Sequence, residues 1–234
     1  MNVFFNSSLD FNKISTSYAI DKRVQIQNVW DLETANSIRH CLANEVEYVY
    51  AYTSKGKNFE ATEQQLKSLS NADMNRFTKE LHEDASQGIG FVYGRQLIKL
   101  ENLAQPSLLH AVCRYLNSDF LLQKIRDISG FEDISLASAK ATRYIPGHFL
   151  TRHNDLNAKE NRRLAYVLNF TPQWHPDWGG LLQFYQKNGL PRDAWAPVFN
   201  SMSLFDVNHI HAVTYIAPYA QTPRYAITGF FRVD

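Results

Sequence analysis

Apolar residues along the first 130 positions recur mainly at the three- and four-residue spacing of helices with one buried face. Helices are predicted over residues 31–42, 71–86, 106–116 and 119–129. Asp31 is a suitable N-cap for the first helix, Pro106 suits the first turn of the third, and Gly130 suits the C-cap of the fourth. Residues 46–53 alternate as a strand does, so this part of the chain is predicted to be mainly, not wholly, helical.

From residue 134 onward the pattern changes to short runs rich in aromatic and β-branched residues, broken by Pro, Gly, Asn and Asp. These runs cover residues 134–145, 163–170, 180–186, 196–206, 211–217 and 224–232. Six runs at short spacing favour a sandwich or barrel of antiparallel strands. No low-complexity linker separates the two parts. We therefore expect one compact α+β unit, in which a helical support region (1–130) packs on the outside of a β-core (131–234).

The composition is sufficient for a folded core and argues against two classes of partner. The chain is 44% hydrophobic, with 15 Phe, 12 Tyr and 4 Trp. Lys and Arg total 24 against 23 Asp and Glu, and the net charge of +1 predicts neither nucleic-acid nor membrane binding. Cys41 and Cys113 lie among apolar residues and are expected to be buried thiols rather than a disulfide. With no visible signal peptide and no long apolar window, a cytoplasmic protein is expected.

The segment 143–155 carries the first motif with chemical meaning. A strand is expected to end near Tyr144, turn at Pro146-Gly147 and continue to His153. Since residues i and i+2 of an extended segment share a face, the His153 imidazole and the Asp155 carboxylate can point to one ion. A ferrous site that activates dioxygen needs three protein ligands on one side and open positions on the other, and two histidines with one carboxylate meet that need.

A third ligand has to come from a distant strand, and the segment 208–213 offers two candidates, His209 and His211. Arg224 begins a further predicted strand and is followed by mostly apolar residues, an unusual setting for a guanidinium unless it meets an anion. The planar fork of an arginine suits a buried carboxylate, because it donates two parallel hydrogen bonds. Thr228, four residues further along the strand, shares its face and can add a hydroxyl.

Each of these motifs alone is weak evidence, because a His-x-Asp triplet recurs by chance and a strand histidine more often has a structural role. Together they indicate a metal site with an anion-binding arginine nearby. Residues 134–234 resemble the prolyl 4-hydroxylase-like branch of the 2-oxoglutarate/Fe(II) oxygenases. The matching elements are Tyr144-x-x-Gly147, His153-x-Asp155, Leu168-Asn169, Trp178-Gly179-Gly180, His211-x-Val213 and Arg224-Tyr-Ala-Ile-Thr-Gly-Phe-Phe.

The resemblance implies a double-stranded β-helix, a cupin-like jelly-roll with the metal at its mouth. It implies that His153, Asp155 and His211 hold Fe(II), and it favours His211 over His209 because Ala-Val follows His211. It also implies that Arg224 pairs with the distal carboxylate of 2-oxoglutarate, in a pocket lined by Tyr144 and Thr228. Ascorbate is allowed as an additional reductant. No catalytic residue beyond the metal centre is required.

Two features depart from the family pattern or stay open. Relatives close to the oxygen-sensing hydroxylases often have a tyrosine before the Leu-Asn pair, where this chain has Val167, so a hydrogen bond to 2-oxoglutarate has to come from Tyr144, Tyr166 or Thr228. His148 lies near the metal strand and is a candidate contact for substrate or 2-oxoglutarate. The aromatic stretch 170–178 is either a clamp for substrate or a loop packed on the barrel rim.

The implied reaction is the O₂-dependent hydroxylation of a C–H bond, with release of succinate and CO₂. A prolyl residue of a protein or peptide is the expected substrate, and a free amino acid or other small metabolite is the alternative. Two other classes fit parts of the pattern: a zinc or manganese enzyme that hydrolyses or isomerises, and a non-catalytic barrel that binds a ligand or metal. Arg224 discriminates against both, because only a dicarboxylate co-substrate requires it.

Overall fold

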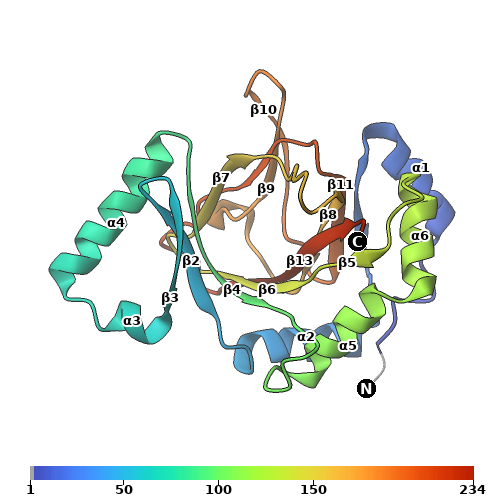
Figure 1. Ribbon diagram of the computed structural model, residues 1–234, viewed down its shortest axis with the longest axis horizontal. Helices are drawn as coiled ribbons and strands as arrows, with labels where there is room; N and C mark the ends of the chain where they lie inside the picture. The colour runs from blue at the N-terminus through green and yellow to red at the C-terminus, as the bar shows by residue number, and fades with distance from the viewer. Residues whose placement is uncertain (1–2) are drawn as a thin grey trace.

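The computed structural model describes residues 3–234 as helices surrounding a single antiparallel sheet that curls into a barrel (Figure 1). The helices are α1 (Phe11–Asp21), α2 (Leu32–Asn44), α3 (Glu63–Lys67), α4 (Asn71–Ser86), α5 (Ser107–Leu116), α6 (Asp119–Ser129) and the 3₁₀ turn η1 (Pro176–Trp178). The strands of the first part are β1 (Arg23–Gln27), β2 (Val49–Ser54), β3 (Lys57–Thr62) and β4 (Phe91–Leu97). Those of the second part are β5 (Leu136–Ala137), β6 (Lys140–Tyr144), β7 (Phe149–His153), β8 (Arg162–Asn169), β9 (Leu182–Tyr185), β10 (Pro191–Trp195), β11 (Ser201–Asp206), β12 (His211–Val213) and β13 (Arg224–Arg232).

Eight strands, β6 to β13, form the barrel as two rows of four. One row is ordered β11-β8-β13-β6 and the other β7-β12-β9-β10. Strand β4 joins the rows at one corner, since the same strand pairs with β6 and with β7. Strand β1 extends the first row beyond β11, and the β2–β3 hairpin adds to the far edge of β4. The expected jelly-roll with helices on its outside is confirmed.

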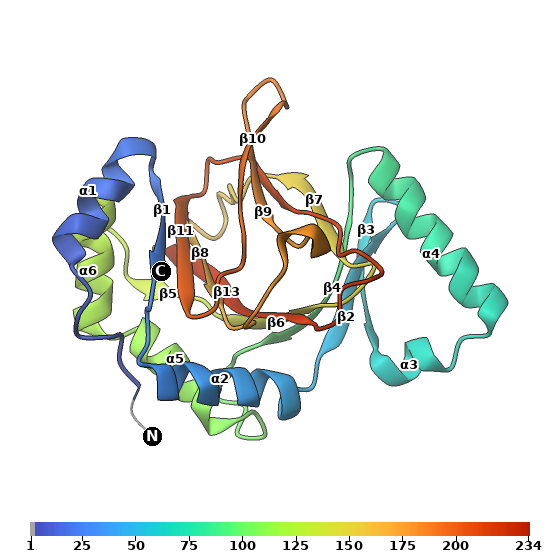
Figure 2. The same ribbon diagram turned by 180° about the vertical axis from the view of Figure 1, so that it is seen from behind.

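The two faces of the first row have different neighbours. Alternate residues of β8, such as Leu164, Tyr166 and Leu168, belong to one large buried cluster with α1, α2, α5 and α6. The intervening residues, such as Ala165 and Val167, face the interior of the barrel. Because strand side chains alternate between faces, the helices cover the apolar outer face and leave the inner face free for polar groups. Figure 2 shows α2 and α5 running beneath this row and α1 and α6 at its end.

Helices α3 and α4 lie on the side of the molecule opposite to α1 and α6 (Figure 1). Helix α4 packs on β2, β4 and β7 through a small cluster made by Leu81, Val92 and Phe149. Cys41 and Cys113 are buried free thiols, as expected. Within residues 3–234, none of the helices combines the length and the apolar character that crossing a bilayer requires.

The sequence patterns locate some elements closely and miss others. Helices α4 and α6 have the predicted bounds, whereas Pro106 is the N-cap of α5 and does not open its first turn. Elements α1, α3, β1, β3, β4 and β10 were not predicted. The predicted run 196–206 becomes a strand only at Ser201, because Asn200 adopts a left-handed conformation with φ of 56° just before it.

The glycine pair at the start of β9 allows two segments of backbone to approach each other closely. Gly179 has φ of 72° and ψ of −145°, a conformation that other residues rarely adopt. A Cβ atom there would lie 1.9 Å from the carbonyl oxygen of Tyr215, and one on Gly180 would lie 3.3 Å from Cδ of Arg224. The pair therefore sets how closely this turn packs beside Arg224.

Gly179→Ala is expected to lower the free energy of unfolding by roughly 2–4 kcal/mol, because backbone strain adds to the overlap with Tyr215. Gly130→Ala is the matched control. Gly130 also has a positive φ, of 78°, but nothing lies within 4 Å of its added Cβ, so a loss of only about 1 kcal/mol is expected. Urea unfolding of both variants measures the difference, and equal losses would show that the close approach is unimportant.

Candidate metal centre

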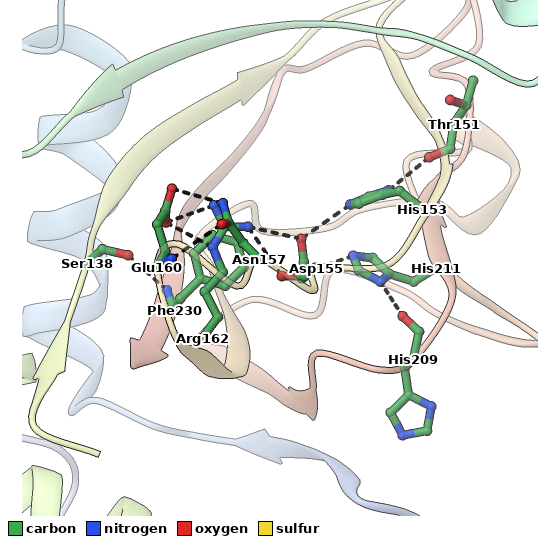
Figure 3. Close-up of polar contacts among 10 residues, drawn as sticks. All are labelled: Ser138, Thr151, His153, Asp155, Asn157, Glu160, Arg162, His209, His211 and Phe230. Carbon is green, nitrogen blue, oxygen red and sulfur yellow. Dashed lines mark hydrogen bonds and ion pairs between the residues drawn. The ribbon is translucent and has the colours of Figure 1, made fainter. Parts of the chain in front are cut away.

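Three side chains with metal-binding atoms meet inside the barrel. Their ligand atoms, from His153, Asp155 and His211, all lie within 4.8 Å of one another. Nε2 of His153 is 3.5 Å from one Asp155 oxygen, and Nε2 of His211 is 3.3 Å from the other. Figure 3 shows the two imidazoles directed at the Asp155 carboxylate from different strands. The arrangement leaves both Nε2 atoms and a carboxylate oxygen available to one ion.

A local irregularity in strand pairing brings the two histidines opposite each other. His211 pairs with His153 and Val213 pairs with Leu150, so β7 contains one residue more than β12 between these pairs. Such a bulge changes which way side chains point. Leu150 and His153 therefore both line the barrel interior, although they are an odd number of residues apart. Asp155 lies two residues beyond the end of β7, and its carboxylate meets the His153 imidazole, as the spacing of the two residues predicts.

Backbone carbonyl groups hold both imidazole rings in place. Nδ1 of His153 is 3.0 Å from the carbonyl oxygen of Thr151, and Nδ1 of His211 is 2.9 Å from that of His209. When Nδ1–H donates to a carbonyl, the lone pair is left on Nε2, which is the atom directed at Asp155. The rings are thus oriented for metal binding by the main chain.

The protonation states of the triad also suit a cation. Burial lowers the pKa of His211 to about 4, so this imidazole is neutral at ordinary pH. Burial by itself would raise the pKa of Asp155, but the neighbouring polar side chains of His153 and His211 outweigh it and hold that pKa below its ordinary value. Neutral imidazole and ionised carboxylate are the forms that bind metals.

His209, the other candidate for the third ligand, points elsewhere. Its Nε2 is 2.9 Å from the carbonyl oxygen of Asp21, and its ring turns away from Asp155 in Figure 3. Only its backbone contributes, through the carbonyl group that holds His211. The structure therefore places His211, and not His209, with His153 and Asp155.

Arg224 lines the same cavity, of about 90 Å³, as the triad. Its side chain is buried, with 3% of the residue exposed, and its one hydrogen bond within residues 3–234 runs from Nη2 to Oδ1 of Asn169 over 3.3 Å. Its Nε has no partner in that part of the chain, and neither has the buried Oγ1 of Thr228. No carboxylate among the described residues pairs with this guanidinium, and burial lowers its pKa. A buried, uncompensated cation of this kind is suited to an anionic ligand.

Aromatic side chains close the cavity beside Arg224. The guanidinium lies 5.4 Å from the ring centroid of Tyr144, which stacks on Tyr93 with centroids 5.0 Å apart. Tyr166 donates its hydroxyl to the carbonyl oxygen of Ser138. Of the three residues that could supply a hydroxyl in place of a tyrosine at position 167, Tyr144 and Thr228 are therefore the better placed.

The six predicted site residues, Tyr144, His153, Asp155, His211, Arg224 and Thr228, all line this one cavity. Two further lining residues, Tyr93 and Lys140, were not predicted. Tyr93 belongs to β4, a strand that the sequence patterns missed. Lys140 was detectable in principle, because it lies four residues before Tyr144 on the same strand and therefore on the same face.

Two other candidates lie outside the cavity. His148 is buried and lines a separate cavity of about 360 Å³ between α4 and the 145–148 turn. The stretch 170–178 packs on itself: Trp174 donates Nε1–H to the carbonyl oxygen of Gly179, and its ring meets that of Trp178 edge-on. These contacts favour a packed rim loop over a substrate clamp.

Residues 139–232 match the family model of the 2OG-Fe(II) oxygenase superfamily, a range that includes all six predicted site residues. No curated protein matches the chain. Solved structures do match along nearly the whole chain. A prolyl-4-hydroxylase from Pseudomonas putida aligns with a TM-score of 0.64 and 18% identity, over 96% of this chain and 100% of its own.

Two further structures extend the comparison. A Trichoplax adhaerens prolyl hydroxylase, in complex with a hypoxia inducible factor oxygen degradation domain peptide fragment, has a TM-score of 0.64 and 16% identity, over 95% of this chain and 88% of its own. A 2OG-Fe(II) oxygenase family oxidoreductase from Burkholderia pseudomallei has a TM-score of 0.63 and 12% identity, over 99% and 95%. At these identities the likeness establishes the fold. Residues 139–232 thus match the 2OG-Fe(II) oxygenase superfamily, and the fold of the chain is that of the prolyl 4-hydroxylases.

Proposed function

We propose that this protein is an Fe(II)- and 2-oxoglutarate-dependent dioxygenase in which His153, Asp155 and His211 hold the metal. Arg224 binds the distal carboxylate of 2-oxoglutarate, and Tyr144 and Thr228 flank it. The observation that carries this proposal is the presence of a buried guanidinium without a carboxylate partner in the same cavity as a His-Asp-His cluster. The donor set suits Fe(II), and the orphaned donors suit a dicarboxylate.

Bound ferrous iron and 2-oxoglutarate supply the oxidising chemistry, in which O₂ gives one oxygen atom to a substrate C–H bond and the other to succinate, with loss of CO₂. The residues of the chain orient the reactants. His153 and His211 keep Nε2 directed at the ion, Arg224 fixes the far end of the co-substrate, and the buried walls limit the access of water.

The rival classes account for less of this arrangement. A zinc or manganese hydrolase can use the same three ligands but has no use for a buried arginine at the other end of the cavity. A non-catalytic barrel has no need to retain both a metal cluster and an anion-binding group. The dioxygenase proposal uses both features.

We propose a prolyl residue of a protein or peptide as the substrate. The shared fold with prolyl 4-hydroxylases supports this, as does the peptide bound to the Trichoplax relative. A free amino acid or small metabolite is the second candidate, favoured by the cationic side chain of Lys140 in the cavity. A role for ascorbate and a cytoplasmic location stay predictions from the resemblance and the composition.

His211→Ala is expected to weaken Mn(II) binding, used as a redox-inert substitute for Fe(II), by roughly a hundredfold or more, because it removes a ligand. His209→Ala is the matched control, since its backbone carbonyl still holds His211. Calorimetric titration of both variants with Mn(II) tests the assignment. Loss of binding in the His209 variant, with binding kept in the His211 variant, would reverse it.

Arg224→Ala is expected to weaken 2-oxoglutarate binding by about 2–5 kcal/mol while Mn(II) still binds, because a buried carboxylate loses its partner. Arg224→Lys should recover only part of the loss, since a lysine lacks the two-pronged donor. Arg163→Ala, which removes an exposed ion pair with Asp133, is the control for the loss of an arginine. Normal 2-oxoglutarate affinity in the Arg224→Ala protein would disprove the role given to this residue.

Succinate release with Fe(II), 2-oxoglutarate and O₂ is expected to increase when a proline-containing peptide is added, and His153→Ala should abolish it. Mass spectrometry of the peptide should show one added oxygen atom on proline. Stimulation by free amino acids alone would favour the second candidate, and absence of succinate under every condition would contradict a dioxygenase.

A further inference from the structure

Strand β6 presents a cation to the barrel interior. Lys140, Thr142 and Tyr144 alternate onto the face that lines the metal cavity. Ala141 and Arg143 face the other way: Ala141 is fully buried in the core beneath the helices, and Arg143 pairs with Glu63. The direction of Lys140 is therefore fixed by the pleat of a strand paired on both sides, with Leu97 of β4 and Thr228 of β13 as its neighbours.

Lys140 has no carboxylate partner among residues 3–234. Asp155, the one carboxylate of the cavity, lies within ion-pair distance of His153, His211 and Arg162, and not of Lys140. The ammonium group lies 5.8 Å from the ring centroid of Tyr93, on the wall of the cavity.

The balance of charge shows what this lysine can do. The negative charge of Asp155 balances the positive charge of one of the two cationic side chains that line the cavity, Lys140 and Arg224. The charges of ferrous iron and of the 2-oxoglutarate dianion cancel each other, so the loaded site keeps one positive charge. Arg162, behind Asp155, is paired with Glu160 and does not alter this count. A half-buried ammonium group of this kind is stabilised by a second anion.

We infer that the substrate carries a carboxylate close to the carbon that is oxidised, and that Lys140 binds it. This inference rests on the proposed dioxygenase function and narrows its substrate class. The carboxylate can be that of a free amino acid, that of the last residue of a chain, or an acidic side chain beside the target proline. All three present the same anion to Lys140, so binding experiments with each are needed to tell them apart.

The test measures binding, so that it does not depend on turnover. The protein is loaded with Mn(II) and 2-oxoglutarate and titrated calorimetrically with three acid and neutral pairs. The pairs are L-proline and L-prolinamide, a peptide ending in proline as acid and as amide, and a peptide with Pro-Glu or Pro-Gln in its interior. At least one acid is expected to bind roughly ten- to a hundredfold more tightly than its neutral partner, as expected for a hydrogen bond between charged groups.

Two variants of Lys140 assign the preference to this side chain. Lys140→Met keeps the length of the side chain without its charge and should remove the preference, whereas Lys140→Arg should keep most of it. Lys79→Met removes an exposed lysine of α4 and should behave as the unmodified protein. Thermal unfolding of each variant shows whether it is folded.

Three outcomes of these titrations would overturn the inference. These outcomes are binding of no acid more tightly than its neutral partner, a preference that survives in Lys140→Met, and a loss of 2-oxoglutarate affinity in Lys140→Met as large as the loss of the preference. The last would assign the lysine to the co-substrate. Failure of the unmodified protein to bind 2-oxoglutarate at all would instead contradict the proposed function, so the two failures are distinguishable.

Discussion

The strands of the first row, β11-β8-β13-β6, lie between two different environments, one on each face of the sheet. Their outer face meets the helices and must be apolar, while their inner face lines a cavity that contains an arginine, a lysine and a carboxylate. The two-residue period of a strand makes this possible, because a single sequence can alternate between the two requirements. The site depends on this separation, since burying Arg224 is tolerable only where the opposite face of β13 stabilises the sheet.

The main chain, more than other side chains, orients the metal-binding side chains. The bulge between β7 and β12 sets His153 opposite His211, and two carbonyl groups fix the tautomer that leaves Nε2 free. Main-chain groups move little once a sheet has formed, so the ligands are oriented before any ion arrives. This preorganisation reduces the entropy that metal binding has to overcome.

The sequence brought together the residues that line the cavity and predicted the class of fold, but it missed several of the strands around them. His153, Asp155 and Arg224 belong to short motifs with a chemical meaning, and those motifs can be recognised without knowing which strands pair. Strand β4 could not be found in this way, because its burial depends on contacts with β2, β6 and β7, which lie far away in sequence. Tyr93 was missed for that reason. The bulge that aligns the histidines was also unpredictable, because the sequence of one strand alone does not determine its pairing register.

Strand β4 also determines how much of the chain the barrel needs. It comes from the first part of the sequence, yet it closes the corner between β6 and β7 and carries the β2–β3 hairpin on its other edge (Figure 2). A fragment trimmed to the family-matched residues 139–232 would leave the hydrogen-bonding edges of β6 and β7 bare, and bare edges recruit other strands. Such a fragment would keep every predicted metal-binding side chain and Arg224 and still be prone to aggregate, because the strand that covers those edges comes from a different part of the sequence.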